Sequence, residues 1–140
     1  MKLITYLSFA GNCEEALNFY KEALGAEILQ VSKMGDSPME VHENLKDKIM
    51  HARLQIGENE LYMSDTFDPA SIKQGNNVSL SIQADDIPQL EKLFDRLSAG
   101  GHVTMPLADA FWGARFGMFV DKFGIHWMFN CELKKEPALN

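Results

Sequence analysis

Two basic side chains stand two residues apart in the segment MHARLQI, residues 50–56, and they could do chemistry together. In an extended strand, His51 and Arg53 project from the same face, and Arg115 is the second residue of a similar segment, ARFGMFVD. Guanidinium groups pair in bidentate fashion with carboxylate and phosphate oxygens, and an imidazole can act as a general base near neutral pH. The pattern predicts a site for an anionic small molecule, with His51 as the candidate catalytic residue.

Two alternatives use the same side chains. Each arginine could instead form an ion pair with Asp65, Asp121 or Glu60, and a single histidine on a strand is more often structural than catalytic. A non-standard divalent metal site could recruit His51 and His126 with Asp65, although these residues share no short ligand spacing.

The composition excludes several classes of function. The 140 residues suffice for one domain, and the fractions of 46% hydrophobic and 24% charged residues are typical of a folded globular protein. A net charge of −7 without a long basic run argues against a nucleic-acid partner. No apolar run approaches the roughly 20 residues that span a bilayer, so we expect no membrane segment and a cytoplasmic protein. Cys13 and Cys131 lie in apolar segments without a CxxC motif, which predicts small buried side chains.

The elements that must position these residues follow one order twice. Alternating or β-branched runs predict strands, and apolar residues at helical spacing predict helices. In the first half, Asn12 is the expected helix N-cap and Gly25 the stop. The expected elements there are a strand at 3–9, a helix at 13–24, a strand at 26–34, a polar excursion at 35–47, and a hairpin of 50–56 and 60–65.

The second half repeats this order after a linker at 66–77. Asp85 or Asp86 is the expected N-cap of its helix, and Gly100-Gly101 the stop. Sliding the sequence by 73 residues places Leu7-Ser8-Phe9 on Leu80-Ser81-Ile82. The expected elements are a strand at 78–83, a helix at 87–97, a strand at 102–109, and a hairpin of 114–121 and 125–130.

Three stretches of the chain resemble a known family. YLSFAGNCEEALNFYKEALGAEI, the pair HARLQIG and LYMSD, and FWGARFGMFVDKFGIHWMFN resemble the PhnB-like branch of the vicinal oxygen chelate superfamily, which includes glyoxalase I, bleomycin-resistance proteins and dihydroxybiphenyl dioxygenase. The resemblance spans residues 3–131. It implies an α+β fold in which two βαβββ modules in tandem, residues 1–66 and 77–133, form one glyoxalase-like domain with half-open barrel sheets around a cavity.

The resemblance also implies where a metal would lie. In enzymes of the superfamily, His and Glu side chains from four strands hold a divalent ion that polarises vicinal substrate oxygens. The matching positions here fall on Thr5, Met63, Asn77 and Met128. Neutral hydroxyl or amide donors and soft thioethers are poor ligands for such an ion. We therefore expect no metal at the superfamily position and no other cofactor.

Strand alternation predicts which side chains share the cavity, if Met63 and Met128 both face it. The side chains predicted to face the cavity are then His51, Arg53, Gln55, Leu61, Asp65, Arg115, Gly117, Phe119, His126 and Asn130, with Trp112 at the rim, and those predicted to face the helices are Ala52, Leu54, Tyr62, Phe116, Met118, Trp127, Phe129 and Cys131.

Within this set, the ligand-binding candidates are Arg53, Asp65, Trp112, Arg115, Phe119 and His126. Several of the eight methionines could add adaptable apolar walls, or could simply fill the core.

The residues and the resemblance leave three functions open. The first is a metal-free protein that sequesters or senses a small molecule, as bleomycin-resistance proteins do. The second is a lyase or isomerase that uses His51 or a non-standard metal, and the third is partner binding alone. The chain has no GxGxxG loop after its first strand, so we do not predict methyl transfer. The resemblance implies a homodimer, and some superfamily members exchange modules, for which 66–77 would be the hinge.

Overall fold

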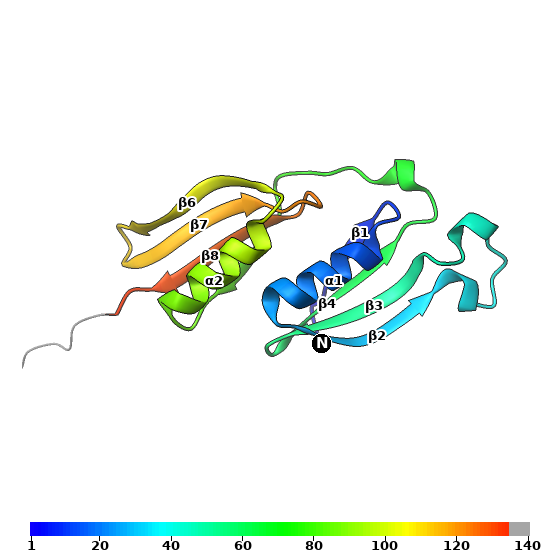
Figure 1. Ribbon diagram of the computed structural model, residues 1–140, viewed down its shortest axis with the longest axis horizontal. Coiled ribbons are helices and arrows are strands. Elements are labelled where there is room, and N and C mark those ends of the chain that lie inside the picture. The colour runs from blue at the N-terminus through cyan, green and yellow to red at the C-terminus, as the bar shows by residue number, and fades with distance from the viewer. Residues whose placement is uncertain (135–140) are drawn as a thin grey trace, which may run out of the picture. The chain divides into compact units, whose positions relative to one another are not determined.

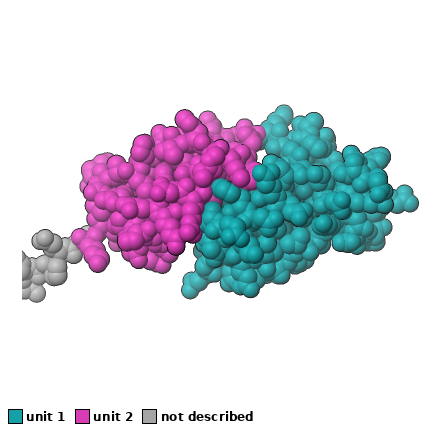
Figure 2. Space-filling model, in the orientation of Figure 1, with its two compact units in different colours: residues 1–73 teal, residues 74–140 magenta. Residues whose placement is uncertain are grey.

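The computed structural model describes residues 1–134 of the chain. The chain divides into two compact units, Met1–Lys73 and Gln74–Asn140, which are coloured separately in Figure 2. The boundary falls inside the expected 66–77 linker. That the two units make up one domain stays a prediction.

Unit 1 contains one four-stranded sheet and one long helix (Figure 1). The strand order is β1-β4-β3-β2, in which only the β1/β4 pair is parallel. Short 3₁₀ helices, η1 (Met34–Asp36), η2 (Glu43–Leu45) and η3 (Pro69–Ser71), lie in the expected polar excursion and linker. The main elements are β1 (Thr5–Phe9), α1 (Cys13–Leu24), β2 (Glu27–Lys33), β3 (Ile49–Ile56) and β4 (Asn59–Asp65).

Unit 2 repeats the same topology. Its strand order, β5-β8-β7-β6, matches that of unit 1 position by position, and again only the first pair is parallel. The elements are β5 (Leu80–Gln83), α2 (Ile87–Ser98), β6 (His102–Ala110), β7 (Ala114–Val120) and β8 (His126–Glu132). The expected α+β fold of two βαβββ modules is confirmed, and each sheet is open rather than closed into a barrel. Within residues 1–134, both α-helices are too short and too polar to cross a membrane.

Register and burial define two faces of the unit 1 sheet. Leu7, Met63 and Ala52 lie side by side on β1, β4 and β3, and all three are buried. The residues that alternate with them, such as Tyr6 and Tyr62, are partly exposed. Because α1 lies across one face of the sheet (Figure 1), the buried row faces α1. We call the other side the open face of unit 1.

The sheet of unit 2 has the same two faces. Leu80, Trp127 and Phe119 form the equivalent row on β5, β8 and β7. Phe94 of α2 packs on this side, with its ring centroid 5.0 Å from that of Phe119 and 5.7 Å from that of Phe129. The open face of unit 2 carries the alternating residues Ser81, Gln83, Phe116, Met118, His126, Met128 and Asn130.

Several predicted side-chain directions are therefore wrong. Gly117 shows the point directly, because a Cβ at this position would lie 2.8 Å from Cε2 of Phe94, on the helix side. Predicted to face the cavity but found on the helix side are Leu61, Met63, Asp65, Arg115, Gly117 and Phe119; predicted to face the helices but found on an open face are Tyr62, Phe116 and Met118.

The physical reason is a slip of one residue between the two copies. The sequence prediction equates Met63 with Met128. In the structure, Leu7 pairs with Met63, whereas its repeat partner Leu80 pairs with Trp127. Met63 and Trp127 are therefore equivalent, and a shift of one residue inverts every side chain. The predicted directions of His51, Arg53, Ala52 and Leu54, and of the β8 residues, are confirmed.

One outer strand of each sheet, β2 in unit 1 and β6 in unit 2, departs from regular pairing. In β2 the register shifts between Ile28 and Gln30 and again between Ser32 and Lys33. In β6 it shifts between Val103 and Met105 and between Met105 and Ala108, a stretch that contains Pro106. Each shift bends its strand locally.

Candidate functional site

Three rings gather on the open face of unit 1. Oη of Tyr6 lies 3.1 Å from Nδ1 of His51, and the two rings stack with centroids 5.8 Å apart. The ring of Tyr62 meets the imidazole edge-on at 5.0 Å. Adjacent strands of the sheet, β1, β4 and β3, supply one ring each. His51 is thus held against two tyrosines, one through a hydrogen bond and a stacked ring and the other through an edge-on ring contact.

A network of three charges borders these rings. Nε of Arg53 donates to Oε1 of Glu60 at 2.9 Å, and Nζ of Lys2 donates to Oε2 of the same carboxylate at 2.8 Å. The guanidinium of Arg53 also lies over the Tyr62 ring, 5.6 Å from its centroid. The hydrogen bonds from Lys2 and Arg53 lower the pKa of Glu60, and the hydrogen bond to Glu60 raises the pKa of Arg53. The expected alternative of an Arg53–Glu60 ion pair is confirmed.

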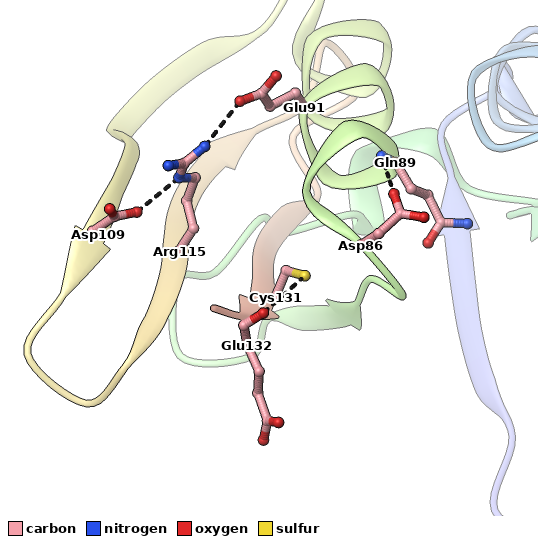
Figure 3. Close-up of polar contacts among 7 residues, drawn as sticks. All are labelled: Asp86, Gln89, Glu91, Asp109, Arg115, Cys131 and Glu132. Atoms are coloured by element: carbon pink, nitrogen blue, oxygen red, sulfur yellow. Dashed lines mark hydrogen bonds and ion pairs between the residues drawn. The ribbon is translucent and has the colours of Figure 1, made fainter. Parts of the chain in front are cut away.

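Arg115, the other predicted anion ligand, lies elsewhere. Figure 3 shows its side chain between Glu91 on α2 and Asp109 on β6. Nε is 2.8 Å from Oδ1 of Asp109, and Nη1 is 3.0 Å from Oε1 of Glu91. The hydrogen bond to Asp109 is the main cause of the raised pKa of Arg115. Arg115 therefore ties α2 to the sheet, and its partners differ from the carboxylates that the sequence suggested.

Asp65, another predicted ligand-binding residue, makes hydrogen bonds within the fold. It is buried at the end of β4, where Oδ1 accepts hydrogen bonds from the backbone N–H groups of Gly11 and Cys13 and Oδ2 accepts one from Ile49. These bonds join the end of β4 to the starts of α1 and β3. Phe119 is likewise buried in the unit 2 core.

Amide side chains lie close together on the open face of unit 2. Nε1 of Trp112 donates to Oδ1 of Asn130 at 3.4 Å, and Nδ2 of Asn130 donates to Oε1 of Gln83 at 2.8 Å. The Trp112 ring also meets that of Phe116 edge-on at 5.5 Å. His126, the remaining candidate, lies half-buried on the same face.

Unit 1 has two hollows whose walls contain none of the predicted site residues. One, of about 570 Å³, is lined by Met39, Glu40, Val41, His42, Leu45 and Phe67. The other, of about 500 Å³, is lined by Ala10, Gly11, Asn12, Asn44, Leu45, Lys48, Thr66 and Pro69. The excursion between β2 and β3 supplies walls to both.

The donors present do not fit the superfamily metal. Thr5 and Met63 lie on the helix side, Asn77 precedes β5, and only Met128 lies on an open face. Glu60, the open-face carboxylate of β4, is held by two cations. Within residues 1–134 no three His, Cys, Asp or Glu side chains are grouped as metal ligands. A metal-free site stays a prediction, now based on these donors.

Sequence reasoning missed four site residues, which are Tyr6, Tyr62, Gln83 and Phe116. Tyr6 lies between the apolar Leu7 and the β-branched Thr5 along β1, so alternation alone could have placed it on the face opposite Leu7. The other three were lost through the register slip or, for Gln83, through the absence of any distinguishing motif.

The fold and these faces define the class of protein. The model of the Glyoxalase/Bleomycin resistance protein/Dioxygenase superfamily matches residues 2–129, and the chain belongs to this superfamily. It is 32% identical to Protein YjdN of Escherichia coli over 99% of each chain.

Solved structures agree with this assignment. The chain is similar to protein PA1353 from Pseudomonas aeruginosa, with 43% identity, a TM-score of 0.85, and coverage of 96% of this chain and 99% of that one. It is also similar to the PhnB protein from Bacillus cereus, with 25% identity, a TM-score of 0.79, and coverage of 94% and 99%. That protein carries the provisional designation of a 3-demethylubiquinone-9 3-methyltransferase.

Proposed function

We propose that this protein binds a small aromatic molecule on the open faces of its sheets. The observation that carries the proposal is the group of Tyr6, His51 and Tyr62, three rings assembled on the face of the unit 1 sheet opposite α1. Tyr6 is 48% exposed. Aromatic side chains with polar tips bind flat ligands through their faces and orient them through their hydrogen bonds.

The charges beside the rings favour one anionic group on the ligand. Lys2 and Arg53 carry two positive charges against the single negative charge of Glu60. A carboxylate near His51 would meet this excess and accept a hydrogen bond from imidazole Nε2. The proposed ligand class of unit 1 is therefore an aromatic carboxylate.

Titration with benzoate, followed by amide and side-chain NMR signals, tests this proposal. We expect shifts at Tyr6, His51 and Tyr62. His51→Ala should weaken binding roughly tenfold, because one hydrogen bond to a charged group is lost. His42→Ala is the matched control, since His42 is an exposed histidine in the loop before η2. Equal binding by both variants, or no binding to the native protein, contradicts the proposal.

One observation favours a second function, that of a lyase or isomerase. The Tyr6 hydroxyl lies 3.1 Å from His51 Nδ1, so the imidazole could remove a proton from a carbon next to a carbonyl while the tyrosine stabilises the charged ring. The test is deuterium uptake by hydroxyacetone in D₂O, observed by NMR. Uptake that His51→Ala abolishes and His42→Ala leaves intact supports an enzyme, and uptake at the buffer rate contradicts it.

We further propose that the protein acts without a bound divalent metal and as a homodimer in the cytoplasm. The superfamily metal positions fall on Thr5, Met63, Asn77 and Met128, whose neutral or thioether side chains support the first point. Elemental analysis of untagged protein should give much less than one equivalent of zinc, nickel or manganese per chain. Light scattering should give twice the mass of one chain, and the mass of a monomer would contradict the proposed homodimer.

A further inference from the structure

The hydrogen-bond chain on the open face of unit 2 has a fixed direction. An indole N–H can only donate, so Trp112 requires the oxygen of the Asn130 amide to point toward it. The nitrogen of Asn130 then points at Gln83 and donates to its Oε1. Consequently the oxygen of the Gln83 amide is already hydrogen-bonded. Its Nε2, with two N–H groups, lies at the exposed end of this series of hydrogen bonds. This end is built to meet a hydrogen-bond acceptor.

A soft apolar surface lies next to this donor. Met128, Met118 and Met105 follow one another in register across β8, β7 and β6. Met105 is 47% exposed, and the other two are half-buried. Thioethers make favourable contacts with aromatic rings and adapt to their outline. In the next row, Phe116 lies opposite Asn130 on the neighbouring strand. The ring of Trp112 packs edge-on against the ring of Phe116.

These two features define the ligand chemistry together. We propose that the open face of unit 2 binds a flat aromatic molecule whose ring lies on the three methionines and whose carbonyl oxygen accepts a hydrogen bond from Nε2 of Gln83. This inference rests on the proposed function, because it assumes that the protein takes small aromatic ligands. It adds a surface whose hydrogen-bonding groups are two amides and an indole, whereas the surface around His51 carries charged groups.

A pair of probes that differ by one oxygen tests the inference. Coumarin has two fused rings and a carbonyl, and 2H-chromene has the same skeleton without the carbonyl oxygen. We expect coumarin to shift the side-chain amide signals of Gln83 and Asn130, the indole signal of Trp112, and the ¹³C-methyl signals of the three methionines. The methyl signal of the buried Met63 serves as an internal reference. 2H-chromene should bind at least fivefold more weakly.

Gln83→Glu is the decisive variant. The carboxylate still accepts the hydrogen bond from Asn130 but has no N–H to offer the carbonyl, so the affinity for coumarin should fall about tenfold. The control is Gln89→Glu, which adds the same charge in the same unit. Gln89 lies at the start of α2, where its Oε1 accepts from the backbone N–H of Asp85, a role that a glutamate can keep.

The variant Trp112→Phe separately tests the direction of the hydrogen bonds from Trp112 to Asn130 and from Asn130 to Gln83. It keeps an aromatic ring but removes the indole N–H, so the two amides are free to reverse. We expect the preference for coumarin over 2H-chromene to shrink to less than twofold, while the affinity for 2H-chromene stays unchanged.

The outcomes separate this inference from the proposed function. Equal affinity for the two probes, an equal loss in Gln83→Glu and Gln89→Glu, or the absence of shifts in unit 2 overturns the inference. If unit 2 gives no shifts but benzoate still shifts Tyr6 and His51, the proposed function stands alone. If benzoate fails as well, both are wrong.

Discussion

The two units share a topology but begin their helices in different ways. In unit 2, Asp86 caps α2 locally, with Oδ1 accepting from the backbone N–H of Gln89 at 2.8 Å. In unit 1, Asn12 makes no side-chain cap. There the carboxylate of Asp65, which lies 52 positions after Cys13, accepts a hydrogen bond from the backbone N–H of Cys13 at 3.0 Å. The same requirement is met by a local bond in one unit and by a tertiary bond in the other.

This difference decides how far a mutation reaches. A local cap touches one end of one helix, so its loss frays that end. Asp65 joins the starts of α1 and β3 to the end of β4, so its loss affects three elements at once. We therefore expect unit 1 to depend on one buried carboxylate more strongly than unit 2 depends on its cap.

The largest expected effect is that of Asp65→Ala. Three buried or partly buried N–H groups would lose their acceptor, and the free energy of unfolding should fall by about 3–5 kcal/mol. Urea denaturation followed by circular dichroism measures this loss. A loss below about 1 kcal/mol would mean that water or another group replaces the carboxylate and that the comparison fails.

Asp86→Ala should have a smaller effect of about 1 kcal/mol, the usual value of one N-cap. The same urea series measures it. Asp85→Ala is the matched control, because the side chain that accepts the capping hydrogen bond is that of Asp86. If Asp86→Ala costs as much as Asp65→Ala, the distinction between a local and a tertiary cap is wrong.

Cys13 gives a prediction for alkaline pH in unit 1. Burial first, and then the charges of Asp65 and Glu14, raise the pKa of its thiol. Because the folded pKa lies above the unfolded value of about 8.5, stability is complete below that pH and falls as the pH rises. Native protein should lose roughly 1 kcal/mol between pH 8.5 and 9.5 that Cys13→Ala does not lose. Identical slopes for the two proteins would contradict this.

The smallest effect concerns Glu60, at the open face of unit 1. Its folded pKa is lowered by the hydrogen bonds from Lys2 and Arg53, so its contribution is present above the unfolded pKa of about 4.3 and is lost as the pH falls below it. The difference in stability between native protein and Glu60→Gln should therefore shrink between pH 6 and pH 3. A difference that is constant over this range would show that the ion pairs contribute nothing.

Local signals in the sequence predicted the fold well. The strands and helices of both units lie within a few residues of the expected ranges, because alternation, helical spacing and glycine stops are properties of short segments. For the same reason the N-cap of α2 was narrowed to Asp85 or Asp86, and the structure identifies Asp86. Asp65 was assigned to a ligand site instead, because no local pattern shows that a carboxylate at the end of β4 will reach α1.

The candidate site was predicted only in part. His51 and Arg53 lie on the open face as expected, since their direction follows from alternation within one strand. Arg115 and Phe119 do not. Their predicted direction depended on aligning the two copies, and the superfamily metal positions were matched to Met63 and Met128, which are one residue out of register with each other. The bond between Tyr6 and His51 depends on which strands are neighbours, and that is a property of the sheet rather than of any segment.

The irregular outer strands have a consequence for the protein in concentrated solution. A regular outer strand offers a row of free N–H and C=O groups to which another chain can add, and this is how many sheets aggregate. At nine residues, β6 is the longest strand of those described in residues 1–134. Pro106 removes one donor from it, and the register shifts around Pro106 break the row into short pieces. Replacing this proline would lengthen the unbroken edge and favour fibre-like association.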